Sequence, residues 1–181
     1  MRASNRIPIL DAAVRIAEQH GFGGVTMEAV AEEAGLTKGG LMYHFGSKDA
    51  LLLGIQHHLA DGWERELEQL AGKTAAECTP RERMAAYVRV SAKQASRAEL
   101  VMQLEAANDA TLSEPWTAVF ERWRPAAESD PQDAAGMTAQ VALLAADGLW
   151  TIEALGVGRL DEAARTRIIE HLVGLLEDGA G

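Results

Sequence analysis

The sequence has a single cysteine, no long apolar run and no excess of basic charge. The lone Cys78 excludes an internal disulfide and offers no cysteine cluster for a metal, so we expect neither a metal nor a cofactor. No apolar stretch approaches the roughly 20 residues that a membrane-spanning helix needs. The first residues also lack the apolar segment and the small-residue cleavage site of a secretory signal. These absences predict a cytoplasmic protein that does not enter the membrane.

The net charge of −10 over 181 residues argues against a polyanionic partner. The acidity is unevenly distributed, however. Residues 1–50 carry five basic and six acidic side chains, a net charge of −1, whereas the remainder carries 12 basic and 21 acidic ones, a net charge of −9. A local basic surface near the N-terminus can therefore still bind phosphate, and we expect that binding to depend on salt.

Apolar residues recur every three or four positions along most of the chain, and no segment alternates as a strand does. The sequence therefore predicts an all-α fold. Capping and helix-breaking residues delimit four N-terminal helices, the fourth over about residues 48–71; they are Gly21, Thr26, Gly35, Thr37, Gly46, Ser47 and Gly72. Later helix starts are indicated by Thr79-Pro80, Ser113-Glu114-Pro115, Asp130-Pro131 and Asp161.

The second and third predicted helices are short and are joined by a tight turn. Ala31 is small where the two helices would cross, and Gly35 can adopt the positive φ that a sharp turn requires. The first turn of the third helix, residues 37–40, has no bulky side chain except Lys38. Its backbone could therefore approach DNA closely, as the second helix of a helix-turn-helix does.

The residues around this turn resemble the N-terminal domain of the tetracycline-repressor (TetR) family of transcriptional regulators. The matching positions are Thr26, Val30, Ala31, Ala34, Gly35, Leu36, Thr37, Lys38, Gly39, Leu41, His44, Phe45, Ser47, Lys48 and Leu51. The resemblance implies a three-helix DNA-binding domain over residues 1–47 and a helical bundle for ligand sensing and dimerisation over residues 48–181. The helix at about 48–71 would link them. The implied function is a DNA-binding regulator, a ligand-responsive homodimeric repressor of a pseudo-palindromic double-stranded operator.

The same resemblance implies roles for individual residues. Phosphate contacts are expected from Thr26, Tyr43, His44 and Lys48, base contacts from Thr37, Lys38, Gly39 and Gly40, and a minor-groove arm from Arg2 and Arg6. Met42 departs from the pattern, because many members of the family have a phosphate-binding tyrosine at this position. Methionine cannot donate that hydrogen bond, so we expect the neighbouring Tyr43 to make the phosphate contact. Thr26 and Thr37 are expected to cap helices whether or not they also contact DNA. Packing of His44 against Phe45 and full solvation of Lys48 are open alternatives.

Beyond residue 52 the sequence resembles the family only in being predicted as helical. Dimer contacts are expected from Val141, Ala145, Gly148, Leu149, Ile152, Ile169, Leu172 and Leu176, although these faces could also bury one another within one subunit. Candidates to line a pocket for a small apolar or cationic ligand are Trp63, Tyr87, Met102, Trp116, Phe120 and Trp150, with a simple core as the alternative. Glu105 and Asp109 could select a cation there, or could form a solvated face.

The sequence shows no catalytic constellation, and we expect no enzyme. Gly21, Gly23 and Gly24 superficially resemble a nucleotide loop, but they follow a helix and lack the later glycine. His57 and His58 are adjacent, so on a helix they point about 100° apart and cannot form a metal pair. Two other functions remain open: an orphan DNA binder or activator without an inducer, and a protein-interaction module that does not bind DNA.

Overall fold

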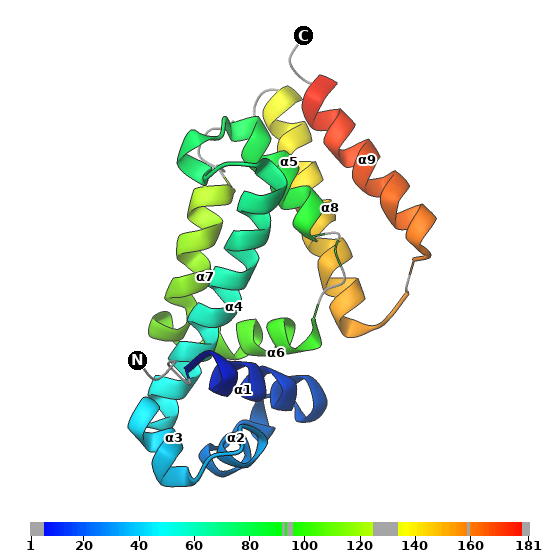
Figure 1. Ribbon diagram of the computed structural model, residues 1–181. Helices are drawn as coiled ribbons and strands as arrows, with labels where there is room; N and C mark the ends of the chain where they lie inside the picture. Colours follow the sequence, from blue (N-terminus) through cyan, green and yellow to red (C-terminus); the bar gives the residue numbers. More distant parts are fainter. Residues whose placement is uncertain (1–5, 92, 94–95, 125–133, 159, 179–181) are drawn as a thin grey trace. The chain divides into compact units, whose positions relative to one another are not determined.

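The computed structural model describes residues 6–91, 93, 96–124, 134–158 and 160–178, and within them it contains helices and turns but no strand (Figure 1). The predicted all-α fold is confirmed. The α-helices are α1 (Arg6–His20), α2 (Met27–Glu33), α3 (Lys38–His44), α4 (Lys48–Ala71), α5 (Pro80–Ser91), α6 (Arg97–Ala106), α7 (Ala110–Trp123), α8 (Ala134–Leu155) and α9 (Glu162–Asp178). Two short 3-10 turns, η1 (Phe22–Gly24) and η2 (Ala75–Glu77), lie between them.

Four of the side chains predicted to begin helices do so. Each accepts a hydrogen bond from a backbone N–H one turn into its helix, which satisfies a donor that has no partner within the helix. The bonds run from Ala29 N to Thr26 Oγ1 (3.1 Å), from Gly40 N to Thr37 Oγ1 (3.1 Å), from Ala50 N to Ser47 Oγ (3.1 Å) and from Ala164 N to Asp161 Oδ1 (2.7 Å).

The start of α7 differs from the sequence-based expectation. The helix begins at Ala110, and Pro115 lies inside it rather than in its first turn. Asp109 is the actual cap, because its Oδ1 accepts hydrogen bonds from the N–H groups of Thr111 (2.8 Å) and Leu112 (3.4 Å). A proline inside a helix removes one backbone hydrogen bond and crowds the carbonyl four residues earlier, so α7 extends past Pro115 from the cap at Asp109 in spite of that cost. The expected start at Asp130-Pro131 lies outside the described residues.

The chain forms two compact units, each considered separately below. The head unit comprises Met1–Asp61 and Ser96–Trp116, and the rear unit comprises Gly62–Ala95 and Thr117–Gly181. This division differs from the boundary predicted at residue 47, because α6 and the first part of α7 join the N-terminal helices. Helices α4 and α7 each contribute residues to both units.

Within the head unit, α1 packs on α2 and on α6, and α2 packs on α3 (Figure 1). Its core is apolar and includes Ile9, Leu10, Val30, Leu41, Phe45, Leu51 and Ile55. One polar side chain, Gln56 of α4, is fully buried among them. Its Nε2 donates to the Met102 carbonyl (2.8 Å), and its Oε1 accepts from the Trp116 indole N–H (2.8 Å). This side chain therefore fastens α4 to both α6 and α7.

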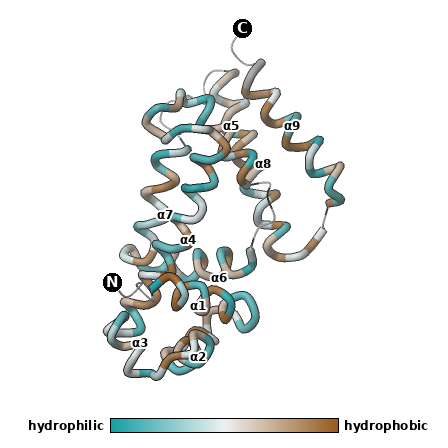
Figure 2. Tube along the Cα trace, viewed as in Figure 1, coloured by the Kyte–Doolittle hydropathy of each residue, from teal (hydrophilic) through white to brown (hydrophobic). Residues whose placement is uncertain are grey.

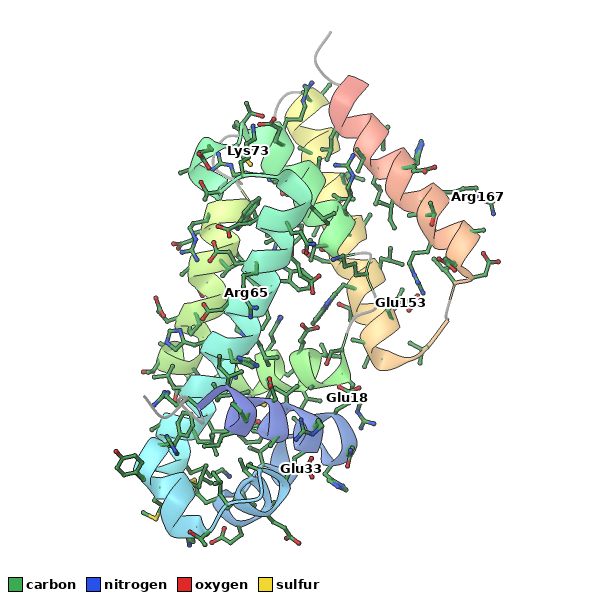
Figure 3. The ribbon with its side chains drawn as sticks, viewed as in Figure 1. Glu18, Glu33, Arg65, Lys73, Glu153 and Arg167 are labelled. Carbon is green, nitrogen blue, oxygen red and sulfur yellow. The ribbon has the colours of Figure 1, made fainter. Side chains whose placement is uncertain are left out.

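A carboxylate of α1 is also committed to α6. Glu18, labelled in Figure 3, accepts hydrogen bonds at Oε2 from the Ala98 N–H (2.6 Å) and from the Ser96 hydroxyl (3.0 Å). Negative charge is favoured at a helix N-terminus, where the backbone N–H groups converge. The first helix of the head is thereby joined to the start of α6.

Within the rear unit, α5, α8 and α9 pack against one another. Hydrophobic residues run along α8, whereas hydrophobic and hydrophilic stretches alternate along α9 (Figure 2). The buried Glu153 of α8, labelled in Figure 3, accepts from Arg165 of α9 (2.9 Å). Arg122 of α7 donates to both oxygens of Glu64 of α4 (2.7 and 2.6 Å), and this guanidinium is the main reason that the pKa of Glu64 is lowered.

The predicted start of α5 at Thr79-Pro80 is confirmed, and Thr79 and Glu82 form a capping box there. Glu82 accepts from the Thr79 N–H (2.8 Å) and also from the Lys73 ammonium, and the Thr79 hydroxyl accepts from the Glu82 N–H (3.3 Å). Lys73, and after it the Thr79 N–H, lower the pKa of Glu82 from 4.5 to about 2. None of the helices in the described parts of the chain has the length and apolar content needed to cross a membrane.

Candidate functional site

The turn between α2 and α3 is built around Gly35, whose φ is +67°. The Leu36 N–H donates to the Ala31 carbonyl (2.8 Å), and the Gly35 N–H donates to the Glu32 carbonyl (3.0 Å). These two bonds form a Schellman motif, which needs a left-handed residue at the position of Gly35. The motif ends α2 sharply and sends the chain directly into α3, so the two helices form the predicted helix-turn-helix.

Helix α3 is attached to the head by one side and exposed on the other. Leu41 is fully buried, and Phe45, directly after the helix, is 1% exposed. In contrast, Met42 is 47% exposed and Tyr43 is 87% exposed, and Lys38 is also exposed. A seven-residue helix is too short to be stable alone. Its packing through Leu41 and its cap at Thr37 therefore hold an outward face in a defined position.

The outward face contains two consecutive glycines that internal packing does not explain. A Cβ added to Gly39 would meet only the Thr37 hydroxyl at 4.0 Å, and one on Gly40 would meet nothing nearer than 3.4 Å. By comparison, a Cβ on Gly54 of α4 would lie 2.7 Å from the Phe45 ring. Each glycine within a helix costs about 0.5–1 kcal/mol relative to alanine. Gly54 has a structural reason for this cost, and the glycines of α3 have none inside the molecule.

Two basic side chains of the head, Arg15 and Lys38, are paired with carboxylates. The Lys38 ammonium donates to Glu28 Oε1 (2.6 Å), and this bond is the main reason that the pKa of Glu28 is lowered. Arg15 donates to Glu33 (2.7 Å), which is labelled in Figure 3. All four side chains are largely exposed. Such ion pairs contribute at most about 1 kcal/mol, so an incoming phosphate or base can replace the carboxylate.

Arg6, a residue of the expected minor-groove arm, lies against the end of α3. Its Nη1 donates to the His44 carbonyl (2.9 Å), and its Cζ lies 4.3 Å from the centre of the Phe45 ring. A cation is favoured at a helix C-terminus, where carbonyls lack partners. Arg2, the other residue of the predicted arm, lies outside the described residues.

The remaining candidates for DNA contact lie at the ends of α2, α3 and α4. The His44 ring packs edge-on against the Tyr43 ring, with centroids 5.3 Å apart. Lys48 is the first residue of α4, and its Nζ lies 5.5 Å from the centre of the Phe22 ring. Thr26 and Thr37 use their hydroxyl oxygens as caps, which leaves each hydroxyl hydrogen available to a phosphate or base.

Four of the six pocket candidates form one aromatic cluster in the rear unit. The ring centroids of Trp63 lie 6.3 Å from Tyr87 and 6.1 Å from Trp150, and Tyr87 lies 6.3 Å from Phe120. The other two candidates, Met102 and Trp116, are buried in the head unit. The candidates therefore do not share a single compact unit.

The acidic group at the aromatic cluster is Asp147, which sequence reasoning missed. Its Oδ1 accepts from the Tyr87 hydroxyl (2.7 Å), and its Oδ2 is paired with Arg124 (2.9 Å). Burial, and then the charge of Asp147, raise the pKa of Tyr87, so the phenol stays protonated. Asp147 precedes Trp150 by three positions and Arg124 follows Phe120 by four, so helical spacing could have revealed both.

The two carboxylates that the sequence suggested for a cation both belong to the head unit. Glu105 is exposed in the head unit, and Asp109 caps α7. Metal ligands are also not assembled among the described residues, where no three histidine, cysteine or carboxylate side chains come together. His58 instead pairs with Asp11 (2.7 Å), and burial raises the pKa of the Cys78 thiol.

The dimer candidates divide between the surface and the interior. Val141, Ala145, Gly148 and Ile152 of α8 are exposed, and Ile169 of α9 is half-buried. Leu149, Leu172 and Leu176 are buried within the chain itself. Three residues that sequence reasoning missed extend the exposed line along α8: Met137, Leu144 and Leu155. Together the exposed α8 residues follow steps of three and four and form one apolar stripe, which we call the α8 stripe.

Two family profiles match the chain. The family described as "Bacterial regulatory proteins, tetR family" matches residues 9–55, and that described as "Tetracyclin repressor-like, C-terminal domain" matches residues 81–177. The HTH-type transcriptional regulator BetI of Burkholderia ambifaria is 29% identical over an alignment of 194 positions. The alignment covers 97% of this chain and 95% of that protein. BetI of Burkholderia cenocepacia is 28% identical with the same coverage.

Solved structures share the fold at lower identity. A transcriptional regulator from Rhodococcus sp. Rha1 has a TM-score of 0.69 and 19% identity, over 98% of this chain and 97% of that chain. The multidrug binding protein EbrR complexed with malachite green has a TM-score of 0.65 and 22% identity, over 96% of this chain and 98% of that chain. The two profiles together cover the helix-turn-helix of α2 and α3 and the helices from α5 to α9. The chain therefore belongs to the TetR family of bacterial regulatory proteins and is a helix-turn-helix transcriptional regulator.

Proposed function

We propose that the chain is a homodimeric repressor that binds a pseudo-palindromic DNA operator through α3 and releases it when a small molecule binds the rear unit. The observation that carries the DNA-binding part is the outward face of α3, where Gly39 and Gly40 have no packing role inside the molecule. Glycine lets the helix backbone approach the floor of the major groove, which is where base edges are read. The proposal locates the chain in the cytoplasm, where bacterial DNA lies.

In this proposal the contacts to DNA are shared between bases and phosphates. Thr37, Lys38, Gly39 and Gly40 face the bases, while Thr26, Tyr43, His44 and Lys48 contact the backbone. Lys38 exchanges the Glu28 carboxylate for a base, at a small cost because the ion pair is exposed. Tyr43 provides the phosphate hydrogen bond that Met42 cannot donate. Lys48 adds its charge to the backbone N–H groups at the start of α4, which favour an anion.

Dimerisation is required because one seven-residue helix makes too few contacts for useful affinity. Two copies that bind half-sites one or more turns apart multiply those contacts. The α8 stripe supports a dimer, since Leu144 alone is 65% exposed and apolar surface of this extent is costly to leave in water. Ala145 and Gly148, both small, let the α8 helices of two copies approach closely. Leu149, Leu172 and Leu176 have no part in this interface because they fill the chain's own core.

Ligand response is proposed from the aromatic cluster of the rear unit. Clustered aromatic side chains with a few polar groups are typical of small-molecule sites. EbrR, a multidrug binding protein with the same fold, has been crystallised with malachite green. Helix α4 runs without a break from Lys48 in the head unit to Ala71 in the rear unit, and it is the proposed route of coupling. The ligand must prefer the DNA-free state, because equal affinity for both states shifts nothing.

A mobility-shift assay with DNA from upstream of the chain's own gene tests the proposal. We expect a shift that weakens as salt is raised and a bound site with two-fold symmetry. Lys38→Ala should relax discrimination between sequences. Lys48→Ala should weaken all sequences alike and reduce the salt slope by about 1. The absence of any shift at low salt would overturn the proposal in favour of a protein-interaction module. A protein that shifts DNA but whose rear unit binds no small molecule would favour an orphan regulator.

A further inference from the structure

A guanidinium group lies over two aromatic rings in the rear unit. The Arg124 Cζ is 5.2 Å from the centre of the Tyr87 ring and 5.8 Å from that of Phe120. Its Nη2 is 2.9 Å from Asp147 Oδ2, while the Tyr87 hydroxyl donates to Asp147 Oδ1 at 2.7 Å. Aromatic faces together with one carboxylate are the groups that bind an organic cation in proteins. The chain's own arginine occupies such a site.

The tyrosine of the site is buried, whereas the guanidinium that occupies it is partly exposed to solvent. Tyr87 is 3% exposed, and its hydroxyl orients the carboxylate of Asp147. The side chains of Arg124 and Asp147 are 28% and 34% exposed, so this ion pair opens to solvent. Arg124 directly follows Trp123, the last residue of α7, and its backbone N–H donates to the Phe120 carbonyl (2.7 Å), so only its side chain is free to move. A partly exposed ion pair contributes little stability, and the guanidinium can move into water without disturbing the rings.

The adjoining wall is apolar and contains an unused donor. Trp63 packs edge-on against both Tyr87 and Trp150. The indole N–H of Trp150 is buried and has no hydrogen-bond acceptor among the described residues. A buried polar group without a partner is uncommon and costs stability. A bound molecule with an apolar body and an oxygen acceptor would satisfy both features of this wall.

We propose that Arg124 fills the place of a ligand's cationic group, and that a monovalent organic cation with an aromatic or aliphatic body displaces it from Tyr87, Phe120 and Asp147. This inference rests on the ligand-responsive part of the proposed function and names its ligand class. Exchange of one cation for another keeps the charge of Asp147 compensated. A neutral or anionic ligand would instead leave a carboxylate in a largely apolar site without a counter-ion. The volume for the ligand's charged group is the volume that the guanidinium vacates.

The test compares benzyltrimethylammonium with neopentylbenzene, its neutral carbon analogue, by tryptophan fluorescence and calorimetry on the full chain. The wild-type protein should bind the cation at least about tenfold more tightly than the neutral analogue. Arg124→Ala and Arg124→Gln should each tighten binding of the cation by about tenfold, because the competing side chain is gone. Asp147→Asn in the Arg124→Ala background should reverse that gain. Arg122→Ala is the matched control, since Arg122 is paired with Glu64 rather than with the aromatic cluster, and it should leave affinity unchanged.

Equal binding of the two compounds, or no gain in either Arg124 variant when thermal unfolding shows both to be folded, would overturn the inference. Operator binding measured in parallel without any cation separates the two proposals. A protein that shifts operator DNA but does not distinguish the compounds retains the DNA-binding function and loses this ligand site. A protein that binds the cation as expected but shifts no DNA retains the site and loses the proposed function.

Discussion

Replacing Gly39 with alanine should stabilise the protein and weaken its binding to DNA. The new Cβ would meet only the Thr37 hydroxyl, at 4.0 Å, which is an ordinary van der Waals distance. Gly39 has no positive φ to strain a side chain, so alanine gains its usual helical advantage of about 0.5–1 kcal/mol. For a chain of this length, that gain raises the thermal midpoint by about 1–4 °C.

The effect on DNA has the opposite sign. If the backbone of α3 lies against the groove floor, the added methyl group must push it outward. Overpacking by one methyl group costs about 1–3 kcal/mol, which corresponds to a roughly 5–150-fold loss of operator affinity for each half-site. Scanning calorimetry measures the first effect, and a mobility shift on the selected operator at fixed salt measures the second.

Gly62→Ala provides the matched control. Gly62 lies inside α4, and a Cβ there would meet only the tip of Arg65, at 3.9 Å. This variant should gain similar stability and keep its full affinity for DNA. A loss of stability in Gly39→Ala would contradict the packing argument. A stabilised Gly39→Ala protein with unchanged affinity would refute close approach of α3 to DNA.

Three further perturbations test the interface, the core and the capping of α5. Leu144→Glu should convert the proposed dimer to a monomer in analytical ultracentrifugation, because it would bury a charge in the apolar α8 stripe. Gln56→Leu should lower the free energy of unfolding by about 1–3 kcal/mol in urea titrations, since the buried Trp116 indole N–H loses its acceptor. Glu82 should stabilise the fold fully above its ordinary pKa of 4.5 and lose that contribution as the pH falls toward about 2. The difference in thermal midpoint between wild type and Glu82→Gln should therefore shrink across that range.

Each of these three predictions has an outcome that would contradict it. Leu104→Glu, at a comparably exposed leucine of α6, should leave the assembly unchanged; equal dissociation by both variants would argue against a specific α8 interface. A Gln56→Leu protein as stable as wild type would show that the polar bridge contributes nothing beyond its volume. A Glu82→Gln difference that stays constant from pH 7 to the acid limit would mean that the carboxylate charge does not stabilise the start of α5.

Features set by neighbouring residues were predictable from the sequence. Helix caps such as Thr26 and Asp161, and the sharp turn at Gly35, depend on backbone groups within a few positions and were predicted correctly. The predicted start of α7 was wrong, because Ser113-Glu114-Pro115 resembles a helix start in the sequence, whereas the helix is capped by Asp109 and continues through Pro115. The glycines of α3 were recognisable from the sequence, but their lack of a packing role required the coordinates.

Which face of a helix lies inside the molecule was decided only by tertiary packing. Leu149 and Leu144 are equally apolar and lie on the same helix, yet one is buried and the other is 65% exposed. Arg124 and Asp147 lie 23 positions apart and form an ion pair only because α7 and α8 bring them together. Local sequence determines where helices begin and end, because the responsible hydrogen bonds span a few residues. Contacts between distant segments depend on how all the apolar faces pack together, and no single stretch of sequence contains that information.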